Sequence, residues 1–156
     1  MYLVDTNVLS AGAPTKAVPT IDLIDWMDRN SAGLHLSVVT IAEIEDGIAK
    51  SRREGASRKA ERLAERLETL LHLYGAQVLP IDLATARQIG RLADRARGEG
   101  HAPGLADLAI AATAQRHGWM VLTRNVRHFT PLGVPAHDPF EALPADVQAD
   151  APGGRP

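Results

Sequence analysis

Cysteine is absent from the chain, and its absence excludes several kinds of chemistry. No disulfide scaffold, thiolate zinc site or cysteine nucleophile can form, so any bound metal would have oxygen or imidazole ligands. Aromatic residues make up only 4% of the 156 residues, which predicts a core of Leu, Ile, Val and Ala. The formal net charge is −2, whereas proteins that bind nucleic acid through bulk charge are usually strongly basic. Such binding would therefore depend on a local basic patch or on metal cations.

Long apolar runs are also missing. No segment approaches the ~18 consecutive apolar residues of a membrane-spanning helix. Residues 1–5 have no basic region ahead of their apolar run, unlike a signal peptide. We therefore expect a cytoplasmic protein that does not associate with membranes.

Short apolar runs alternate with amphipathic segments along the chain, which predicts an α/β domain with a mainly parallel sheet and helices on both faces. We expect the domain to span residues 1–143 and to be followed by a disordered tail, 144–156, rich in Asp, Ala, Pro and Gly. The predicted strands are residues 2–4, 34–38, 77–80 and 119–122, with a fifth beginning at Val134. The predicted helices are residues 19–30, 40–51, 57–74, 83–97 and 103–117, with Ile21, Ile24 and Met27 as the buried stripe of the first.

Asp5 directly follows the first predicted strand. In parallel α/β sheets, ligands bind at the carboxyl ends of the strands. A carboxylate at such a strand end is poorly solvated unless a cation or hydrogen-bond donors face it. Asp5 can equally cap the turn formed by residues 6–8, so this residue alone does not decide between a metal ligand and a cap.

Glu43 and Asp107 lie early in two of the predicted helices. Thr40 and Glu43 have the spacing of a capping box, although the neighbours of Glu43 are largely apolar. Asp107 belongs to a helix that is apolar nearly all round, where a carboxylate without a partner is costly. The alternative for Asp107 is a favourable interaction with the helix dipole, worth about 0.3–1 kcal/mol.

Three carboxylates beside apolar segments are hard to explain as three unrelated caps. Hard cations prefer carboxylate oxygens, and Mg²⁺ usually takes few protein ligands while it keeps several waters. Bound Mg²⁺ or Mn²⁺ can orient a water molecule, lower its pKa and neutralise charge on a phosphate. The sequence therefore favours a metal site, although residues so far apart along the chain do not prove one.

Four segments, in order along the chain, closely resemble the PIN-domain nucleases, specifically the VapC-type toxins of bacterial toxin–antitoxin pairs. They are residues 3–10 (LVDTNVLS), 37–44 (SVVTIAEI), 107–114 (DLAIAATA) and 122–129 (LTRNVRHF). The resemblance covers about residues 2–143. It implies a three-layer α/β/α sandwich and a Mg²⁺- or Mn²⁺-dependent endoribonuclease that hydrolyses RNA phosphodiesters with metal-activated water. It also implies a homodimer and a VapB-type antitoxin that blocks the acidic site.

The resemblance assigns site residues by position. Asp5, Glu43 and Asp107 match the three acidic metal-site positions of the family. Asn125 stands where the family often has a fourth acid, at the end of the fourth strand. An amide oxygen can bind a cation but brings no negative charge, so we predict one firmly held ion, and a second only with substrate phosphate. The supporting residues that we expect are Thr6, Asn7, Thr123 and Arg124.

Two groups of arginines are candidates for contact with RNA. Arg124 and Arg127 are the better candidates, because they follow a strand end close to the expected site. The arginines of the long helix alternate with glutamates, and we expect them to form a solvated face with ion pairs. They are Arg58, Arg62 and Arg66. We expect His128 to pack at the surface near the site.

The sequence leaves two alternatives to a ribonuclease function open. Asp5-Thr6-Asn7 weakly resembles the aspartate-nucleophile loop of HAD-type phosphotransferases, but that chemistry needs an acid where Asn7 stands. A PIN-like protein without catalytic activity could also act within a regulatory complex. The presence of all three acids argues against this second alternative.

Overall fold

A five-stranded parallel sheet lies at the centre of the protein, with the strand order β3-β2-β1-β4-β5. The structure is a computed structural model that describes residues 1–9 and 18–147. The strands are β1 (Tyr2–Val4), β2 (Leu34–Ser37), β3 (Val78–Leu79), β4 (Met120–Leu122) and β5 (Ala136–His137). The strands therefore form where the apolar runs predicted them, although β3 and β5 are shorter than expected.

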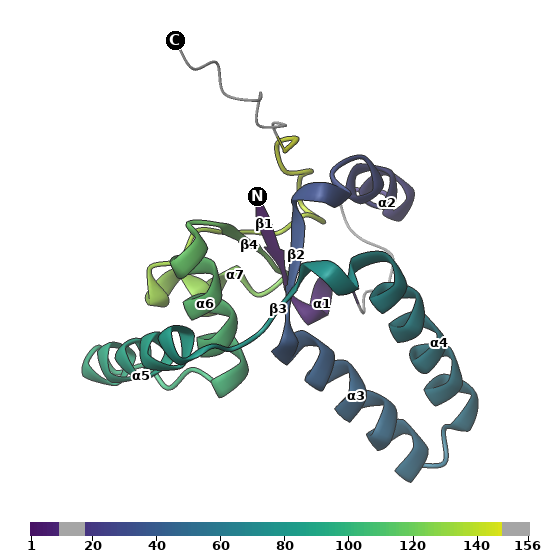
Figure 1. The fold of residues 1–156 in the computed structure, drawn as a ribbon, viewed down its shortest axis with the longest axis horizontal. Helices are drawn as coiled ribbons and strands as arrows, with labels where there is room; N and C mark the ends of the chain where they lie inside the picture. The colour runs from purple at the N-terminus through teal and green to yellow at the C-terminus, as the bar shows by residue number, and fades with distance from the viewer. Residues whose placement is uncertain (10–17, 148–156) are drawn as a thin grey trace.

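Helices cover both faces of the sheet, which confirms the expected three-layer α/β/α sandwich (Figure 1). The described helices are α1 (Thr6–Leu9), α2 (Thr20–Arg29), α3 (Val38–Arg53), α4 (Ser57–Tyr74), α5 (Leu83–Gly98), α6 (Leu105–His117) and α7 (Val126–Phe129). Short 3₁₀ segments span Ser31–Gly33, Gly75–Gln77 and Thr130–Leu132. None of the described helices combines the length and the apolar character that a membrane crossing needs.

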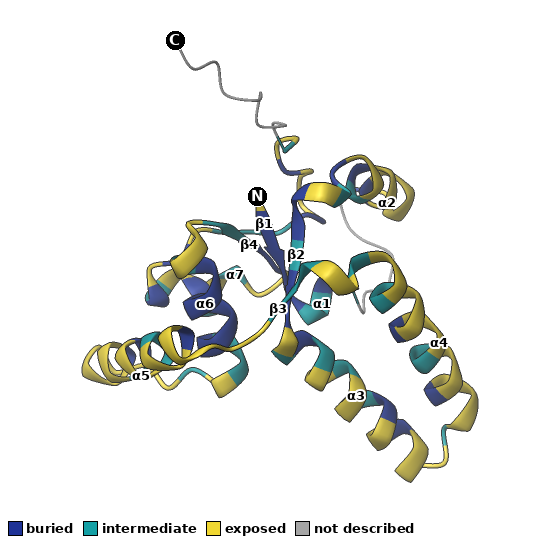
Figure 2. Cartoon of the chain, viewed as in Figure 1, coloured by how far each residue is buried: buried dark blue, intermediate teal, exposed yellow. Residues whose placement is uncertain are grey.

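Two main cores lie on opposite faces of the sheet. On one face, α5 and α6 pack against the sheet through residues such as Leu92 and Ile110. On the other face, Trp26 of α2 packs with Tyr2 and Leu36. A smaller core joins α3 to α4, and this helix pair projects away from the sheet (Figures 1 and 2). In Figure 2, α6 is mostly buried, whereas α3, α4 and α5 each have one exposed side.

The order of the strands creates a switch point between β1 and β4. β2 and β3 lie on one side of β1, in that order. The chain then crosses to the other side of β1, where β4 and β5 lie. The connections from β1 and β4 therefore lead in opposite directions, and ligands of parallel α/β sheets bind at the carboxyl ends of two such strands. Asp5 and Thr123 directly follow β1 and β4, so both residues lie at this switch point.

The buried face of α2 differs from the one predicted. Ile21 and Ile24 are 62% and 47% exposed, whereas Leu23 and Trp26 are buried. The indole of Trp26 packs edge-on against Tyr2 of β1, with ring centroids 5.5 Å apart. The prediction for Ile21 and Ile24 was wrong because a second apolar stripe on the same helix carries the larger aromatic side chain.

Residues 144–147 pack against the domain, beyond the boundary expected at residue 143. The Tyr2 hydroxyl donates a hydrogen bond to the Ala145 carbonyl (2.7 Å), and the buried Asn30 accepts one from the Val147 amide (2.6 Å). A side chain on Gly33 would clash with Val147, since an added Cβ would lie 2.5 Å from its methyl groups. The rest of the expected tail, residues 148–156, lies outside the described residues.

The orientation of α2 gives a stability prediction. Trp26→Ala should lower the free energy of unfolding by about 3–5 kcal/mol, because it removes a buried aromatic side chain from the core. Ile24→Ala on the same helix should cost less than about 1 kcal/mol, because its side chain is already half exposed. Urea denaturation of both variants measures these values, and equal losses would contradict the orientation described here.

Candidate functional site

Asp5 lies at the switch point as a buried acid, with only 6% of its surface exposed. Its backbone amide donates a hydrogen bond to the Leu122 carbonyl at the end of β4 (2.9 Å). This bond continues the pairing of β1 with β4 by one residue beyond the strands. The sheet itself therefore holds Asp5 in place.

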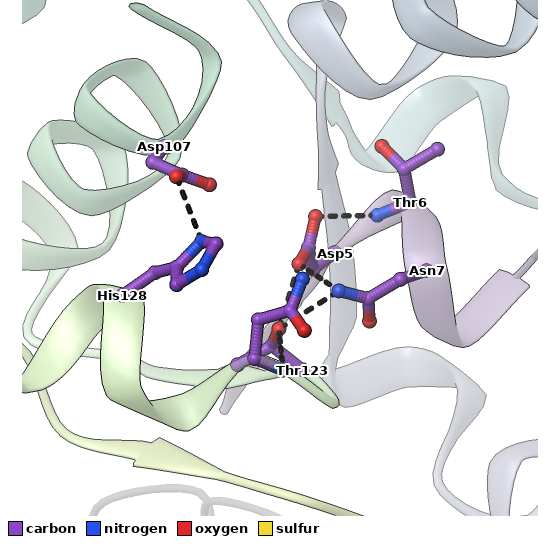
Figure 3. A network of polar contacts seen from close by, with 7 residues as sticks. Asp5, Thr6, Asn7, Asp107, Thr123 and His128 are labelled. Atoms are coloured by element: carbon purple, nitrogen blue, oxygen red, sulfur yellow. Dashed lines mark hydrogen bonds and ion pairs between the residues drawn. The ribbon is translucent and has the colours of Figure 1, made fainter. Parts of the chain in front are cut away.

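Hydrogen-bond donors surround the Asp5 carboxylate (Figure 3). Oδ1 accepts a hydrogen bond from the Thr6 amide (2.7 Å). Oδ2 accepts two, from the Asn7 side-chain amide and from the Thr123 hydroxyl, both at 2.7 Å. The expected supporting roles of Thr6, Asn7 and Thr123 thus correspond to direct contacts with the acid.

Thr123 is the central residue of this network. It is fully buried, and its hydroxyl accepts hydrogen bonds from the Asn7 side chain (3.1 Å) and the Asn125 amide (3.0 Å) while it donates to Asp5. Asn7 in turn accepts a hydrogen bond from the Arg124 amide (3.0 Å). Helix α1 after β1 and the loop after β4 are therefore joined through side chains, and this arrangement fixes the rotamer of Asp5.

Glu43 is not part of a capping box. Helix α3 begins at Val38, and Ser37 is its N-cap, accepting a hydrogen bond from the Val39 amide (3.2 Å). Thr40 therefore lies inside the first turn and is fully buried. The capping interpretation of Glu43 was wrong because the helix is capped by Ser37, three residues before Thr40. Instead, Glu43 accepts a hydrogen bond from the Thr6 hydroxyl, so Thr6 contacts both Asp5 and Glu43.

Asp107 lies in the first turn of α6 and contacts His128 of α7. Asp107 Oδ2 is 3.1 Å from His128 Nδ1 (Figure 3). Both side chains line a cavity of about 270 Å³ that also includes His101 and Arg127. We expected His128 only to pack at the surface. The contact depends on how α7 docks beside α6, which no pattern in the sequence indicates.

The two neighbouring acids act on the ionisation of Asp5. Burial is the largest cause that raises the Asp5 pKa, and the negative charges of Glu43 and Asp107 raise it further. The hydrogen bonds from Thr123 and Thr6 lower it, but the net shift is upward from the ordinary value of 3.8. The Asp5 carboxyl therefore binds its proton more tightly in the folded protein than in the unfolded chain. Its contribution to the free energy of unfolding falls as the pH rises from the unfolded-state pKa through the higher folded-state pKa.

The donor set fits a hard divalent cation. Each of the three carboxylates keeps at least one oxygen lone pair that the contacts described above leave free. A cation between them would also offset the charge that raises the Asp5 pKa. However, the described residues contain no group of three or more His, Asp or Glu side chains close enough to form a ready-made metal cage. Such an ion would therefore keep water molecules in its coordination shell, as Mg²⁺ commonly does.

Asn125 and Arg124 lie at the rim of the site. Asn125 is exposed and precedes α7, and its described contact with the site is the backbone bond to Thr123. The guanidinium of Arg124 lies 5.1 Å from the centre of the Phe140 ring, in a cation–π contact. Neither side chain forms a described hydrogen bond with an acid, so their catalytic roles stay predictions.

The fold and the site define the class of this protein: a parallel α/β sandwich with a carboxylate site at its switch point. The family model for the PIN domain matches residues 2–130, so the chain belongs to the PIN-domain family. This finding confirms the resemblance seen in the four sequence segments and excludes the HAD-type alternative. PIN-domain nucleases generally use a divalent metal ion.

Relatives and solved structures agree with this family. The chain is 36% identical to the VapC ribonuclease Y4jK of Sinorhizobium fredii, over 90% of this chain and 99% of that protein. It is 32% identical to the toxin FitB of Neisseria gonorrhoeae, again over 90% and 99%. The crystal structure of FitAcB from the same organism covers 91% of this chain and 100% of its own, with a TM-score of 0.74.

The position of Thr123 generates a prediction about stability and pH. Thr123→Val keeps the shape of the side chain but removes the hydroxyl, leaving buried partners unsatisfied, so it should cost about 1–3 kcal/mol. Since the lost bond stabilises ionised Asp5, the cost should be larger at the higher of two pH values that lie on either side of the raised Asp5 pKa. Urea denaturation at the two pH values measures this.

Thr130→Val is the matched control for this measurement. Thr130 is an exposed threonine whose hydroxyl donates only to the Val126 carbonyl of its own turn. This variant should cost less than about 1 kcal/mol and show no pH dependence. A pH-independent loss in Thr123→Val would show that its hydroxyl does not act on the ionised carboxylate.

Proposed function

We propose that this protein is a metal-dependent endoribonuclease and the toxin of a toxin–antitoxin pair. One observation carries the catalytic part of the proposal: at the switch point of the sheet, Thr6 bonds to the buried Asp5 through its amide and to Glu43 through its hydroxyl, and Asp107 is close enough to add to the negative charge at Asp5. Three mutually repelling acids are costly to the fold, and a bound cation offsets that cost. The relatives named as a VapC ribonuclease and as the toxin FitB support both parts.

The proposed metal ligands are Asp5, Glu43 and Asp107, holding Mg²⁺ or Mn²⁺ directly or through water. When bound, such an ion supplies Lewis acidity toward a phosphate oxygen and lowers the pKa of a coordinated water. Thr6 orients Asp5 and Glu43 together, because its amide and its hydroxyl donate to one acid each. Asn7 and Thr123 hold the second oxygen of Asp5, Oδ2, while Oδ1 accepts the hydrogen bond from the Thr6 amide.

The residues around the acids suggest how RNA is held. Arg127 lines the cavity beside Asp107 and is exposed, so it is placed to bind a phosphate of the substrate. Arg124 stacks on Phe140 and would have to leave this ring to approach the acids. Asn125 supplies an amide in place of a fourth acid, which favours a single firmly held ion in the absence of substrate.

The toxin role implies a partner. Solved structures similar to this chain include FitAB bound to a DNA fragment, with 30% sequence identity and a TM-score of 0.70. By analogy, we expect this chain to form a homodimer in the cytoplasm and to be blocked by a VapB-type antitoxin. A basic antitoxin side chain would bind the same three acids that otherwise hold the cation.

Asp5→Asn tests the catalytic proposal. The substitution keeps the size of the side chain but removes the charge of the central ligand, so it should lower the rate of RNA cleavage by about 100-fold or more. The measurement is cleavage of a labelled synthetic RNA in Mg²⁺ or Mn²⁺, with circular dichroism to show that the fold is retained. Addition of EDTA to the unaltered protein should lower the rate of cleavage at least as much.

Asp46→Asn is the matched control, because Asp46 is an exposed acid on the same helix as Glu43. It should cleave RNA at the rate of the unaltered protein. Full activity in Asp5→Asn, or undiminished activity in EDTA, would contradict the metal mechanism. A folded but inactive unaltered protein under all metal conditions would instead favour a non-catalytic PIN-like partner.

Growth on induction tests the toxin role separately. Expression of the unaltered chain alone in a bacterial host should arrest growth, while Asp5→Asn should grow like an empty-vector strain, because the arrest depends on cleavage. Co-expression of a small DNA-binding protein encoded in the adjacent reading frame should restore growth. If cleavage in vitro is normal but induction leaves growth unchanged, the toxin role is wrong and the nuclease activity stands.

A further inference from the structure

Helix α5 has a strongly basic outer face. Arg87, Arg91 and Arg95 recur every four residues and are all exposed, and we call them the α5 ridge. The opposite side of the helix, which includes Leu92 and Ala96, is buried in the core beneath it. Because one face is fixed against the sheet, the ridge must point to solvent.

The ridge has one neighbouring acid, Asp94, which lines a shallow pocket with Arg87 and Arg91. In the part of the chain that the structure describes, Arg87, Arg91 and Arg95 form no ion pair with an acid. The single acid within α5, Asp94, lies 3.9 Å from Arg97 instead. In a protein with a net charge of −2, this helix is therefore a local concentration of positive charge.

Helix α4 provides a comparison within the same molecule. It also carries three exposed arginines at four-residue spacing, Arg58, Arg62 and Arg66. There, three glutamates of the same helix alternate with them, namely Glu61, Glu65 and Glu68. The ion pairs that we expected on α4 do not form among the residues that the structure describes. With Lys59 included, the charged side chains of α4 sum to +1, whereas those of α5 sum to +3. The two helices have similar arginine spacing but different net charge.

The C-terminal end of α5, which follows the ridge along the chain, lies toward the acidic site. Helices α5 and α6 are antiparallel: Gln88 near the start of α5 bonds to Gln115 near the end of α6 (2.7 Å). The far end of α5 therefore lies beside the start of α6, which carries Asp107. A cavity of about 150 Å³ there is lined by Arg97 and Pro103, and Pro103 also lines the larger cavity that contains Asp107.

We propose that the α5 ridge binds the sugar–phosphate backbone of the RNA substrate beyond the cleavage site. This proposal rests on the proposed ribonuclease function and names the surface that holds the substrate away from the reacting phosphate. Arginines four residues apart are separated by about 6 Å along a helix, close to the spacing of successive phosphates along a strand. The substrate is then an RNA that extends several nucleotides beyond the scissile bond and contacts α5.

The test compares two triple variants of the full-length chain. Arg87→Gln, Arg91→Gln and Arg95→Gln together remove the ridge, and the same change at Arg58, Arg62 and Arg66 is the matched control on α4. Both sets carry the Asp5→Asn substitution, so that RNA is not cut while fluorescence anisotropy measures its binding. A labelled single-stranded RNA of about 20 nucleotides is titrated at several salt concentrations.

We expect the α5 variant to bind this RNA about tenfold more weakly at low salt. The slope of log Kd against log salt should fall by about 2, since each phosphate contact on a single strand contributes about 0.7. The α4 variant should keep the Kd and the slope of the parent protein. If the ridge binds nucleotides beyond the cleavage site, the loss of affinity in the α5 variant should be smaller for a four-nucleotide RNA than for the 20-nucleotide RNA.

Cleavage by the same triple variants without Asp5→Asn completes the test. With long RNA, the α5 variant should have a raised KM and an unchanged kcat, because the acidic site is intact. An α5 variant with unchanged binding, salt slope and KM would overturn the ridge proposal while leaving the nuclease proposal in place. An equal loss in the α4 variant would also overturn it. Absence of cleavage by the unaltered protein would refute the proposed function instead.

Discussion

The buried carboxylate of Asp5 is the point on which the site depends. It lies where β1 and β4 end side by side, and its own amide extends their pairing. Burying an ionisable acid is costly, and the structure meets part of this cost with hydrogen bonds from Thr6, Asn7 and Thr123. These donors come from helix α1 and from the residue that follows β4, on the two sides of the switch point. The strand order and the rotamer of one side chain are therefore linked, since a different order would separate Asp5 from Thr123.

The donors around Asp5 do not remove the repulsion from its neighbours. Glu43 and Asp107 are held nearby by separate helices, and each has a polar partner of its own, Thr6 and His128 respectively. The net effect on Asp5 is a raised pKa, so a protein without a cation is less stable near neutral pH than its packing alone would make it. Such strain is common at functional sites, where a ligand offsets a cost that folding alone does not.

Charge is distributed unevenly over the helices that surround this acidic site. The α3–α4 pair projects from the sheet and carries alternating arginines and glutamates. On the other side, α5 carries four arginines and a single acid, and its end lines a small cavity that shares Pro103 with the cavity containing Asp107. The acidic centre and the positive ridge can coexist in one small domain. They act on different phosphates of the proposed substrate. The cation acts on the reacting phosphate, and the ridge acts on phosphates farther along the strand.

The sequence by itself determined the α/β architecture and the place of Asp5. Strand-length apolar runs and helical periodicity are local patterns, and an acid directly after β1 must lie at the carboxyl edge of the sheet. Only the tertiary structure decided which face of α2 is buried, that Thr6 bonds to Glu43, and that His128 contacts Asp107. Local patterns do not encode these features, because each depends on the packing of elements that are distant along the chain. Asp5 and Thr123 are 118 residues apart, and the strand order alone brings their side chains to 2.7 Å.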